Sequence, residues 1–504
     1  MEKDPITTEE MRILELNAQF LGVTHSMLMQ NAGREVARVV AKTSKVKEKH
    51  IAILCGLGGN GGDGIVAARY LDEAGAFVDV YLLGDERTIR NEDTLHNWEI
   101  LNNLHDILAS ELLTESAVKS CRAIKEADIL IDGIMGFGLR SKLREPLLTA
   151  VKMINKSAAI KYSIDIPSGI DSESGVVHGA AVKADHTIAL HAPKTGMTNA
   201  KEFVGNLHVV SIGIPKEAGY TCGPGDLRPF IQPRDLHAKK GDFGRILVVG
   251  GSDVYSGAPA LAGMAALRTG ADLVSVLAPE PVVSAIRSYS PNLMVTSLGT
   301  QVLLPETVET VIEHASNNHV VALGPGLGLE QQTKVAVTSI VEQLIKSKTP
   351  LVLDADGLKA MASSELNLNS DLTVMTPHWG ELSILMDHDL GDDTSLPNRV
   401  DQAIACAKKY NSVILLKGPV DVVAEPNGKF KLNRTGVPAM TVGGTGDVLT
   451  GIVAALLATD VPAFLAASAG AFVSGMAGEL AFDERGDHVV ATDCIENIHS
   501  VFDM

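Results

Sequence analysis

Short apolar runs that end in glycine turns, each followed by a helical pattern, recur along almost the whole chain. In the first half they read "HIAILCG", "FVDVYLLG", "ADILIDGIMG", "AIKYSIDIPSG" and "HTIALHAPK". In the second half they read "GRILVVGGS", "ADLVSVLAP", "VVALGPGLG", "TPLVLDADG", "LTVMTPHWGE" and "SVILLKGP". Strands that alternate with helices in this way predict parallel sheets covered by helices. The segment "VVAEPNGKFKL" instead predicts a β-hairpin at a sheet edge, because "PNG" separates two strand-like runs.

The length of the chain and one gap in this pattern predict two domains. A chain of 504 residues exceeds what one hydrophobic core normally organises. The pattern stops in "IPKEAGYTCGPGDLRPFIQPRDLHAKKGDFG", which is rich in glycine and proline and therefore typical of a linker. We expect one domain over residues 1–222, with a Rossmann-like doubly wound sheet, and a second α/β domain over residues 226–504. The halves share no motifs, so an internal duplication is not supported.

Charge and cysteine usage restrict the partners and the compartment. The 61 acidic residues outnumber the 43 basic ones, and a net charge of -18 disfavours nucleic acid and anionic membranes as partners. The five cysteines are widely spaced and form no C-x-x-C pair, which is typical of reduced thiols in a cytoplasm. The start, "MEKDPITTEEMRILELN", lacks the order of a secretory signal. The uncharged "VPAFLAASAGAFVSGMAG" at 461–478 consists mostly of small residues and predicts a buried helix, not a membrane span.

The first glycine-rich loop, "GLGGNGGDG" at 56–64, has the G-x-G-x-x-G spacing of a dinucleotide-binding turn, and Asp79 follows in the next strand. Asp63 argues against a pyrophosphate in this turn, because two like charges a few ångströms apart cost on the order of a few kcal/mol at an effective dielectric near 20. Asn60 and Asp63 supply side-chain oxygens, which suit a cation or a ribose. The structural alternative is that Asp63 only caps the helix.

Two further loops at strand ends supply oxygen atoms. They are "DGIMGFGL", which contains Asp132, and "SIDIPSGI", which contains Asp165 and Ser168. The carboxyl ends of the strands in a doubly wound sheet meet at one crevice. We therefore expect Asn60, Asp132 and Ser168 to surround one hard cation. Asp165 then remains available for proton transfer.

The second glycine-rich loop, "GGTGDVLTG" at 443–451, precedes the helical "IVAALLA". Its glycines allow a tight turn that directs backbone N–H groups at an anion, and the helix dipole adds to the attraction. Asp447 follows at the helix start, where it could take a proton from a hydroxyl that attacks a phosphoryl group. No G-x-x-x-x-G-K-[ST] occurs, so a P-loop is excluded. The structural alternative is a simple helix cap.

Other loops of the second half point to the same crevice: "GPGLG" at 324–328, "LDADGL" at 353–358, "TPHWGE" at 376–381 and "LKGPVD" at 416–421. His378 precedes a helix, where it either meets a ligand or has a structural role. Lys417 either neutralises a nucleotide phosphate or faces solvent. The small-residue helix in "GGSDVYSGAPALAGMAALRTGA" suits close contact with a flat ligand.

Taken together, these motifs resemble one family. "GLGGNGGDG", "DGIMGFGL" and "SIDIPSG" resemble the amino-terminal domain of the bifunctional NAD(P)H-hydrate repair enzymes. "GGSDVYSGAPALAG", "GPGLG", "LDADGL", "TPHWGE" and "GGTGDVLTG" are similar to their ribokinase-like dehydratase domain. The resemblance covers almost the whole chain in the family's order, and this co-occurrence is far more specific than any single motif.

The resemblance implies two activities on NADHX or NADPHX, in which water has added across the 5,6 double bond of the nicotinamide. The first domain interconverts the R and S epimers. The second removes water from the S form at the expense of ADP, and releases AMP and phosphate. Phosphorylation of the hydroxyl makes a good leaving group, with Asp447 as the base. Potassium in the epimerase site, and Mg²⁺ with the nucleotide, are the implied ions.

The resemblance also implies which residues form each site. In the epimerase site they are Gly59, Asn60, Gly61, Gly62, Asp63, Gly136, Phe137, Gly138, Leu139, Arg140, Ser141, Lys142 and the catalytic Asp165, with potassium on Asn60, Asp132 and Ser168. In the dehydratase site Ala258, Gly326, His378 and the catalytic Asp447 contact the hydrate, while Lys417, Gly418, Pro419, Val420, Asp421 and Gly446 hold the nucleotide. Gly59 departs from the family, which commonly has asparagine there.

Two other functions remain open on the sequence. Ribokinase-like motifs also occur in small-molecule kinases, which release a stable phosphorylated product. The first domain could also act only as a dinucleotide-sensing module. We expect a cytoplasmic homo-oligomer that acts on small molecules only.

Overall fold

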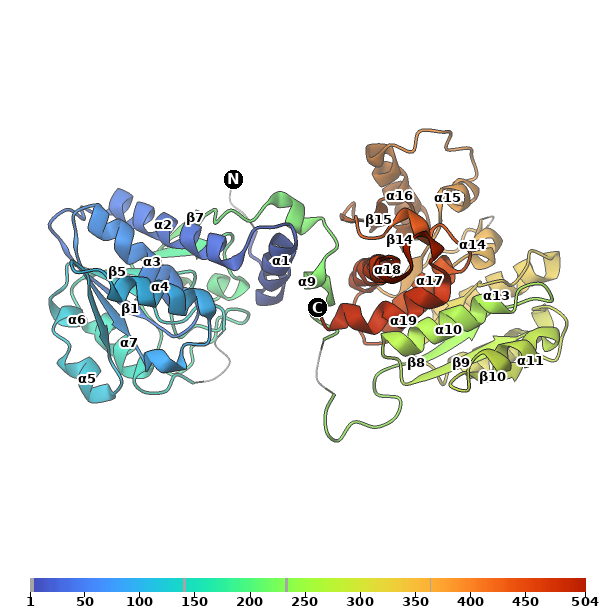
Figure 1. Cartoon of the computed structure of the whole chain (residues 1–504), viewed down its shortest axis with the longest axis horizontal. Coiled ribbons are helices and arrows are strands. Elements are labelled where there is room, and N and C mark those ends of the chain that lie inside the picture. The colour runs from blue at the N-terminus through green and yellow to red at the C-terminus, as the bar shows by residue number, and fades with distance from the viewer. Residues whose placement is uncertain (1–3, 139–141, 232–233, 363) are drawn as a thin grey trace. The chain divides into compact units, whose positions relative to one another are not determined.

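The computed structural model describes residues 4–138, 142–231, 234–362 and 364–504. The chain divides into two compact units, Met1–Ala218 and Gly219–Met504 (Figure 1). The division precedes the expected boundary at 222–226, because two residues of the linker pair with the second unit. The N–H of Cys222 donates to the carbonyl of Leu432 at 2.9 Å, and the N–H of Leu432 donates to the carbonyl of Tyr220 at 2.7 Å.

The first unit is built on a parallel sheet that has seven strands among the described residues, in the order β3-β2-β1-β4-β5-β6-β7. The strands are β1 (His50–Cys55), β2 (Phe77–Leu82), β3 (Leu108–Glu111), β4 (Ile129–Gly133), β5 (Ile160–Ile164), β6 (His186–Leu190) and β7 (Asn206–Val210). From β1 the next two strands, β2 and β3, are added toward one edge of the sheet, and from β4 the strands β5 to β7 are added toward the other edge. This order confirms the doubly wound sheet and places its switch point between β1 and β4.

Helices cover both faces of this sheet because alternate residues of each strand point to opposite faces. Ile51 and Ile53 of β1 pack in one apolar cluster with α2 (His25–Thr43), α3 (Gly59–Glu73) and α4 (Glu92–Asn102). Ala52 and Leu54 pack in the other, with α5 (Glu115–Ser120), α6 (Ala123–Glu126) and α7 (Leu147–Lys156). The remaining helices of this unit are α1 (Thr8–Phe20) and α8 (Lys201–Val204).

The second unit contains a nine-stranded sheet among the described residues, in the order β10-β9-β8-β11-β12-β13-β14-β15-β16. Its strands are β8 (Arg245–Val249), β9 (Leu273–Ala278), β10 (Met294–Ser297), β11 (Val320–Leu323), β12 (Leu351–Leu353), β13 (Thr373–Met375), β14 (Val413–Leu416), β15 (Asp421–Ala424) and β16 (Phe430–Asn433). The strands from β10 to β14 are parallel, whereas β15 and β16 form an antiparallel hairpin. The hairpin predicted at the sheet edge is confirmed.

Two apolar clusters flank the second sheet. One contains side chains of α10 (Gly257–Thr269), α11 (Glu280–Tyr289), α17 (Thr445–Leu457), α18 (Ala463–Arg485) and α19 (Ala491–Phe502). The other contains those of α12 (Val308–Ala315), α13 (Gln331–Ser347), α14 (Asp356–Met361), α15 (Trp379–Met386) and α16 (Leu396–Tyr410). A short helix, α9 (Pro224–Leu227), starts the unit. This three-layer arrangement confirms the α/β class.

Helix α18 contains most of the uncharged stretch at 461–478. It is long and apolar enough to cross a membrane, but 83% of its most apolar window is buried inside the protein. The predicted buried helix is confirmed. All five cysteines are free and buried.

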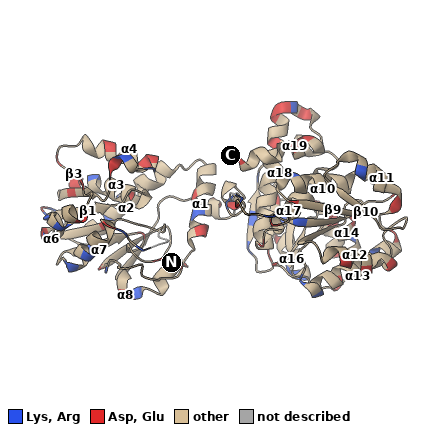
Figure 2. Cartoon of the chain, turned by 90° about the horizontal axis from the view of Figure 1, so that it is seen from below, with Lys and Arg blue, Asp and Glu red and all other residues tan. Residues whose placement is uncertain are grey.

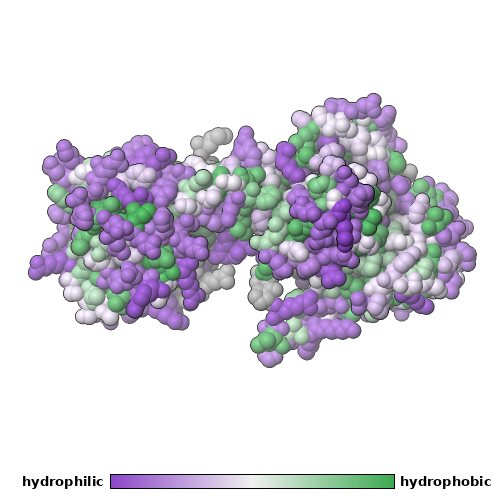
Figure 3. All heavy atoms as spheres, viewed as in Figure 1, coloured by the Kyte–Doolittle hydropathy of each residue, from purple (hydrophilic) through white to green (hydrophobic). Residues whose placement is uncertain are grey.

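The sequence pattern missed three strands, β3, β7 and β10. Each is partly exposed along its length and carries no continuous apolar run. Acidic and basic residues are interspersed over the outer helices of both units in Figure 2. On the face shown in Figure 3, hydrophobic residues form small patches among hydrophilic ones.

Candidate active sites

The first unit contains a cavity of about 840 Å³ beside the carboxyl ends of β1, β4, β5 and β6. It lies at the switch point of the sheet, where doubly wound proteins bind their ligands. Of the predicted site residues, it is lined by Gly59, Asn60, Asp63, Gly136, Phe137, Gly138 and Asp165. Leu139, Arg140 and Ser141 lie outside the described residues, and Lys142 is exposed. The structure therefore brings most of the described residues predicted for this site together.

Two glycines of the first loop shape the turn and do not line the cavity. A Cβ on Gly61 would lie 1.9 Å from the carbonyl oxygen of Gly56, and one on Gly62 would lie 2.5 Å from Cε of Met29. Apart from its chain neighbours and its own helix, no described residue lies within 4 Å of a Cβ built on Gly59. The loop therefore requires glycine at position 61, whereas position 59 has room for the asparagine that is common in the family.

Asp63 lies inside helix α3 and does not cap it. Helix α3 begins at Gly59, and its N-cap residue is Gly58, so the capping alternative is wrong. Burial, together with the charges of Asp165 and Glu15, raises the pKa of Asp63 well above its usual value, although Lys194 opposes the shift. A raised pKa shifts the balance toward the neutral carboxyl, which repels an anionic ligand less than the carboxylate does.

Asp165 follows β5 and forms a buried ion pair. Its Oδ1 accepts hydrogen bonds from Nζ of Lys194 at 2.5 Å and from the N–H of Leu190 at 3.3 Å. Its Oδ2 is buried and has no hydrogen-bond partner among the described residues. Lys194 also donates to the carbonyls of Leu190 and Ala192, so its ammonium group is saturated. Its Nζ lies 5.7 Å from the ring centre of Phe137. The sequence interpretation missed Lys194, although it follows the β6 run in "HTIALHAPK".

Asp132, Ser168 and Asn60 are placed near the same strand ends. The carboxylate of Asp132 accepts the hydroxyl of Ser168 at 2.6 Å and the backbone N–H of Ser168 at 2.9 Å. Burial raises its pKa, although these hydrogen bonds oppose the shift. The amide of Asn60 is buried, and neither Oδ1 nor Nδ2 has a hydrogen-bond partner in the part of the chain that the structure describes. Such a group costs about 1–3 kcal/mol, so its oxygen is free to bind a ligand.

The second site is organised around the first turn of α17. Gly444, with φ +97°, is the N-cap residue and no side chain caps the helix. Asp447 lies in this turn, and no hydrogen bond to its carboxylate occurs within the described residues, so the capping alternative is wrong here too. Burial and the charges of Asp354 and Asp356 raise its pKa to about 7, against the opposing charge of Lys417.

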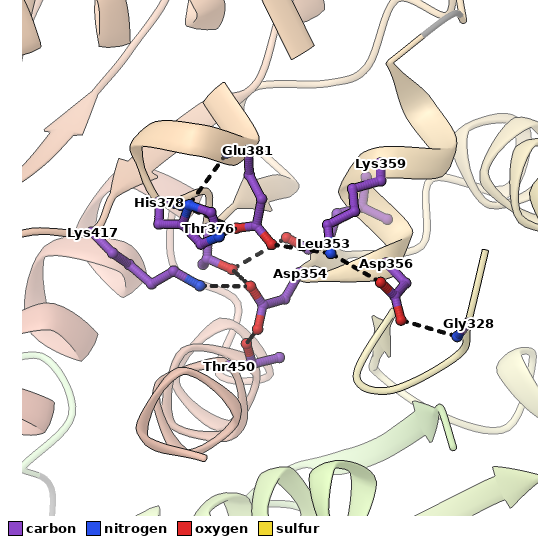
Figure 4. A network of polar contacts seen from close by, with 10 residues as sticks. All are labelled: Gly328, Leu353, Asp354, Asp356, Lys359, Thr376, His378, Glu381, Lys417 and Thr450. Carbon is purple, nitrogen blue, oxygen red and sulfur yellow. Dashed lines mark hydrogen bonds and ion pairs between the residues drawn. The ribbon is translucent and has the colours of Figure 1, made fainter. Parts of the chain in front are cut away.

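A network of polar contacts connects α17, through Thr450, to the loop after β12 and to Lys417 (Figure 4). Asp354, which is buried after β12, accepts hydrogen bonds from Nζ of Lys417 at 2.9 Å and from the hydroxyl of Thr450 at 2.7 Å. Burial alone would raise the pKa of Asp354, but Lys417 and the hydroxyl donors outweigh it, and the pKa is lowered. Lys417 is therefore not a solvent-facing lysine. Its Nζ would lie 3.4 Å from a Cβ on Gly446.

His378 has a structural bond and an accessible ring. It is the N-cap residue of α15, and its Nδ1 accepts the N–H of Glu381 at 3.3 Å. Its side chain is 59% exposed. A structural role at the start of α15 and contact with a ligand are therefore compatible for His378.

Ala258 and Gly326 are neighbours in space. Gly326 has φ +68°, and a Cβ there would lie 3.3 Å from Cβ of Ala258.

The loop from Lys417 to Asp421 is stabilised by Arg399, whose guanidinium donates to the carbonyls of Leu416, Lys417 and Val420. Oδ1 of Asp421 accepts a hydrogen bond from the N–H of Gly418, and its Oδ2 accepts one from the side-chain amide of Asn433. Pro419 is exposed and Val420 is partly buried.

These sites define a two-domain α/β enzyme, with a Rossmann-like unit that contains a carboxylate-lined cavity and a ribokinase-like unit with a glycine-rich turn at the start of α17. Residues 25–196 match the family described as YjeF-related protein N-terminus, and residues 246–500 match the one described as NAD(P)H-hydrate dehydratase. A ribokinase-like superfamily protein from Enterococcus faecalis has the fold of the second unit: it is 23% identical, with a TM-score of 0.50, over 56% of this chain and 95% of its own.

Two relatives match nearly the whole chain. The bifunctional NAD(P)H-hydrate repair enzyme Nnr of Hyperthermus butylicus is 40% identical over 494 residues, which are 98% of this chain and 91% of the relative. That of Pyrobaculum aerophilum is 41% identical over 506 residues, 99% of this chain and 98% of the relative. The chain belongs to the family of bifunctional NAD(P)H-hydrate repair enzymes.

Proposed function

We propose that this protein repairs hydrated nicotinamide cofactors in two steps, each in its own unit. The first unit interconverts the R and S epimers of NADHX and NADPHX, and the second dehydrates the S epimer at the expense of ADP. One observation supports both steps: within the described residues, Oδ2 of Asp165 has no hydrogen-bond partner, and no hydrogen bond to the carboxylate of Asp447 occurs. A reaction that begins by removing a proton from a hydroxyl requires such a group.

In the epimerase site, Asp165 is the catalytic base. Its ion pair with Lys194 fixes Oδ1, and therefore Oδ2 is the oxygen that meets the hydrate. Gly59, Asn60, Asp63, Gly136, Phe137 and Gly138 surround the ligand in the same cavity. Gly61 and Gly62 support it through the shape of the loop.

Potassium suits the oxygens beside this cavity. Hard cations bind carboxylate, hydroxyl and amide oxygens, and no described residue forms a hydrogen bond with the amide oxygen of Asn60. Asp132 supplies the negative charge and Ser168 the hydroxyl oxygen next to it. We propose that these three residues hold K⁺, which supplies a fixed positive charge for the ligand.

In the dehydratase site, Asp447 takes the proton of the 6-hydroxyl, whose oxygen then attacks the terminal phosphoryl group of ADP, and AMP leaves. The ring nitrogen expels the phosphate, and loss of the C5 proton restores the 5,6 double bond. The uncapped N–H groups of α17 and the ammonium of Lys417 face the phosphates. Ala258, Gly326 and His378 contact the hydrate, while Gly446 and the loop from Lys417 to Asp421 hold the nucleotide. Mg²⁺ accompanies the nucleotide, since it binds phosphates together with one or two carboxylates.

The test uses the full chain with separated R and S epimers of NADHX. We expect exchange of the epimers without a nucleotide, and recovery of NADH absorbance from the S epimer with ADP. A stable phosphorylated product would indicate a small-molecule kinase instead. Tight binding of the epimers without exchange would indicate a sensing module. Location in the cytoplasm and assembly as a homo-oligomer stay predictions.

A further inference from the structure

The amino-terminal segment is built into the strand end that holds Lys194. The N–H of Ile6 donates to the carbonyl of Pro193 at 2.9 Å, and the N–H of Thr195 donates to the carbonyl of Ile6 at 3.1 Å. Helix α1 follows, with Thr7 and Glu10 forming a capping box at its start. This segment precedes the region that matches a family, residues 25–196. Its anchoring fixes α1 relative to the ion pair of the epimerase site.

Helix α1 directs one face into the cavity of about 840 Å³. Met11 and Glu15, which are one turn apart and therefore on the same side of the helix, both line it. Met11 is buried, as expected for packing. Glu15 is partly buried, and no hydrogen bond or ion pair within 4 Å engages its carboxylate in the described part of the chain. Burial of a carboxylate that forms no such bond costs free energy, so Glu15 does not stabilise the fold through a hydrogen bond or ion pair of its own.

The charged groups around Glu15 come from three elements and from α1 itself. Asp165 follows β5, Lys194 follows β6, Asp63 belongs to α3 and Arg12 to α1. Burial and the charge of Asp165 raise the pKa of Glu15 to about 7, although Lys194 and Arg12 lower it. Near neutral pH both forms of Glu15 are therefore populated.

We propose that Glu15 is a second catalytic acid–base residue of the epimerase site and acts together with Asp165 on the hydrated nicotinamide. The inference rests on the proposed function and deepens it. Epimer exchange at a carbon that bears both a hydroxyl and a ring nitrogen requires a proton to leave one atom and another to reach a second atom. Because Lys194 engages Oδ1 of Asp165, Oδ2 alone is left for the hydrate, and one oxygen cannot take the first proton while it delivers the second.

The chemistry balances with these two groups. Asp165 takes the proton of the 6-hydroxyl, the C6–O bond becomes a carbonyl, and the C6–N1 bond breaks with its electron pair on N1. Glu15, in its neutral form, donates its proton to N1. After rotation about the C5–C6 bond, N1 attacks the other face of the carbonyl. N1 returns its proton to Glu15, and Asp165 returns its proton to the oxygen, so that only the configuration at C6 has changed.

The experiment compares Glu15→Gln with the full-length wild type and with Glu73→Gln, an exposed change at the end of α3. Epimer exchange is followed by chiral separation without nucleotide, from pH 5.5 to 8.5. Dehydration of purified S epimer with ADP reports the other unit. We expect kcat for exchange to fall roughly 100-fold or more in Glu15→Gln, with dehydration unchanged. The change in kcat for exchange that the wild type shows near pH 7 should be absent in Glu15→Gln. Glu15→Asp should have part of the wild-type rate, with this change moved to another pH.

Several results would overturn the inference. One is exchange by Glu15→Gln at the wild-type rate, and another is a slower rate that still changes near pH 7 as in the wild type. If Glu15→Gln does not fold, the pH dependence of Glu15→Asp decides, and a change in kcat at the same pH as in the wild type refutes the role. If the wild type itself exchanges no epimers, the proposed function fails and the inference fails with it. That outcome is distinguishable, because it does not depend on any variant.

Discussion

Nζ of Lys194 lies 2.5 Å from Oδ1 of Asp165, and this buried pair holds an aspartate whose backbone has φ +65°. Left-handed conformations of residues other than glycine are found preferentially at functional sites, at a cost of order 1 kcal/mol. The surrounding structure therefore stabilises an unfavourable backbone conformation that places Asp165 beside the cavity, with Oδ2 free of hydrogen bonds from the described residues. The ion pair therefore fixes the orientation of the Asp165 carboxylate, which the sequence motif "SIDIPSG" alone does not indicate.

The first prediction concerns this pair. Lys194→Met removes the cation and leaves the carboxylate of Asp165 buried and unpaired, which should destabilise the first unit by about 3–5 kcal/mol. Hydrogen exchange of peptides from the first unit measures the change. Lys201→Met, an exposed lysine of the same unit, is the matched control. Equal protection in both variants would contradict a stabilising role for the pair.

The second prediction contrasts two glycines of one loop. Gly61→Ala should abolish epimer exchange and destabilise the first unit, because its Cβ would lie 1.9 Å from the backbone oxygen of Gly56. Gly59→Ala should leave stability within about 0.5 kcal/mol of the wild type, since no described residue outside its own helix and its chain neighbours lies within 4 Å of the new Cβ. Thermal unfolding and the exchange assay check both variants. A stable, active Gly61→Ala variant would contradict this prediction, because it would show that the loop can adopt another backbone conformation.

The sequence identified the loops but not every group that they bring together. Glycine turns after apolar runs mark strand ends, and a doubly wound sheet brings strand ends together, so Asn60, Asp132 and Asp165 were predictable as a cluster. Lys194 ends the apolar run "HTIALHAPK". No feature of the neighbouring sequence indicates that its ammonium group contacts Asp165. Glu15 lies on an amphipathic helix whose position depends on backbone bonds of Ile6, and such contacts leave no periodic signal.

Two interpretations by local rules failed for a physical reason. Asp63 and Asp447 follow glycines in the manner of cap residues, but the helices begin earlier, with Gly58 and Gly444 as their N-cap residues. Glycine can occupy this position without a side-chain bond, so Asp63 lies beyond the first turn of α3 and Asp447 lies within the first turn of α17. Both carboxylates are at least partly withdrawn from water. Burial, which the sequence does not give, raises their pKa values.

The third prediction concerns potassium. Replacement of K⁺ by choline should lower epimer exchange and leave ADP-dependent dehydration unchanged, since the proposed ligands all belong to the first unit. Asn60→Ala should lower exchange in K⁺ to the level of the wild type in choline, and should no longer respond to K⁺. Titration of K⁺ against the exchange rate checks this. An Asn60→Ala variant with an undiminished response to K⁺ would exclude that side chain as a ligand.

The fourth prediction concerns the base of the dehydratase site and its pH dependence. Because the pKa of Asp447 is raised to about 7, its carboxylate is protonated below that pH and ionised above it. A base must be ionised, so kcat for dehydration should fall about tenfold for each pH unit below the pKa and level off above it. The rates are measured from pH 5.5 to 8.5 with S epimer and ADP.

Asp447→Asn tests the assignment within the same pH range. The amide cannot accept the proton, so the rate should fall roughly 100-fold or more and lose its dependence on pH near 7, while epimer exchange stays at the wild-type rate. Asp401→Asn, an exposed change on α16, should behave as the wild type in both assays. A wild-type rate that is flat from pH 5.5 to 8, or an Asp447→Asn variant that keeps the slope, would mean that another group removes the proton. Asp354 could not take that role without first losing its bond to Lys417, whose charge holds the pKa of Asp354 low against the effect of burial.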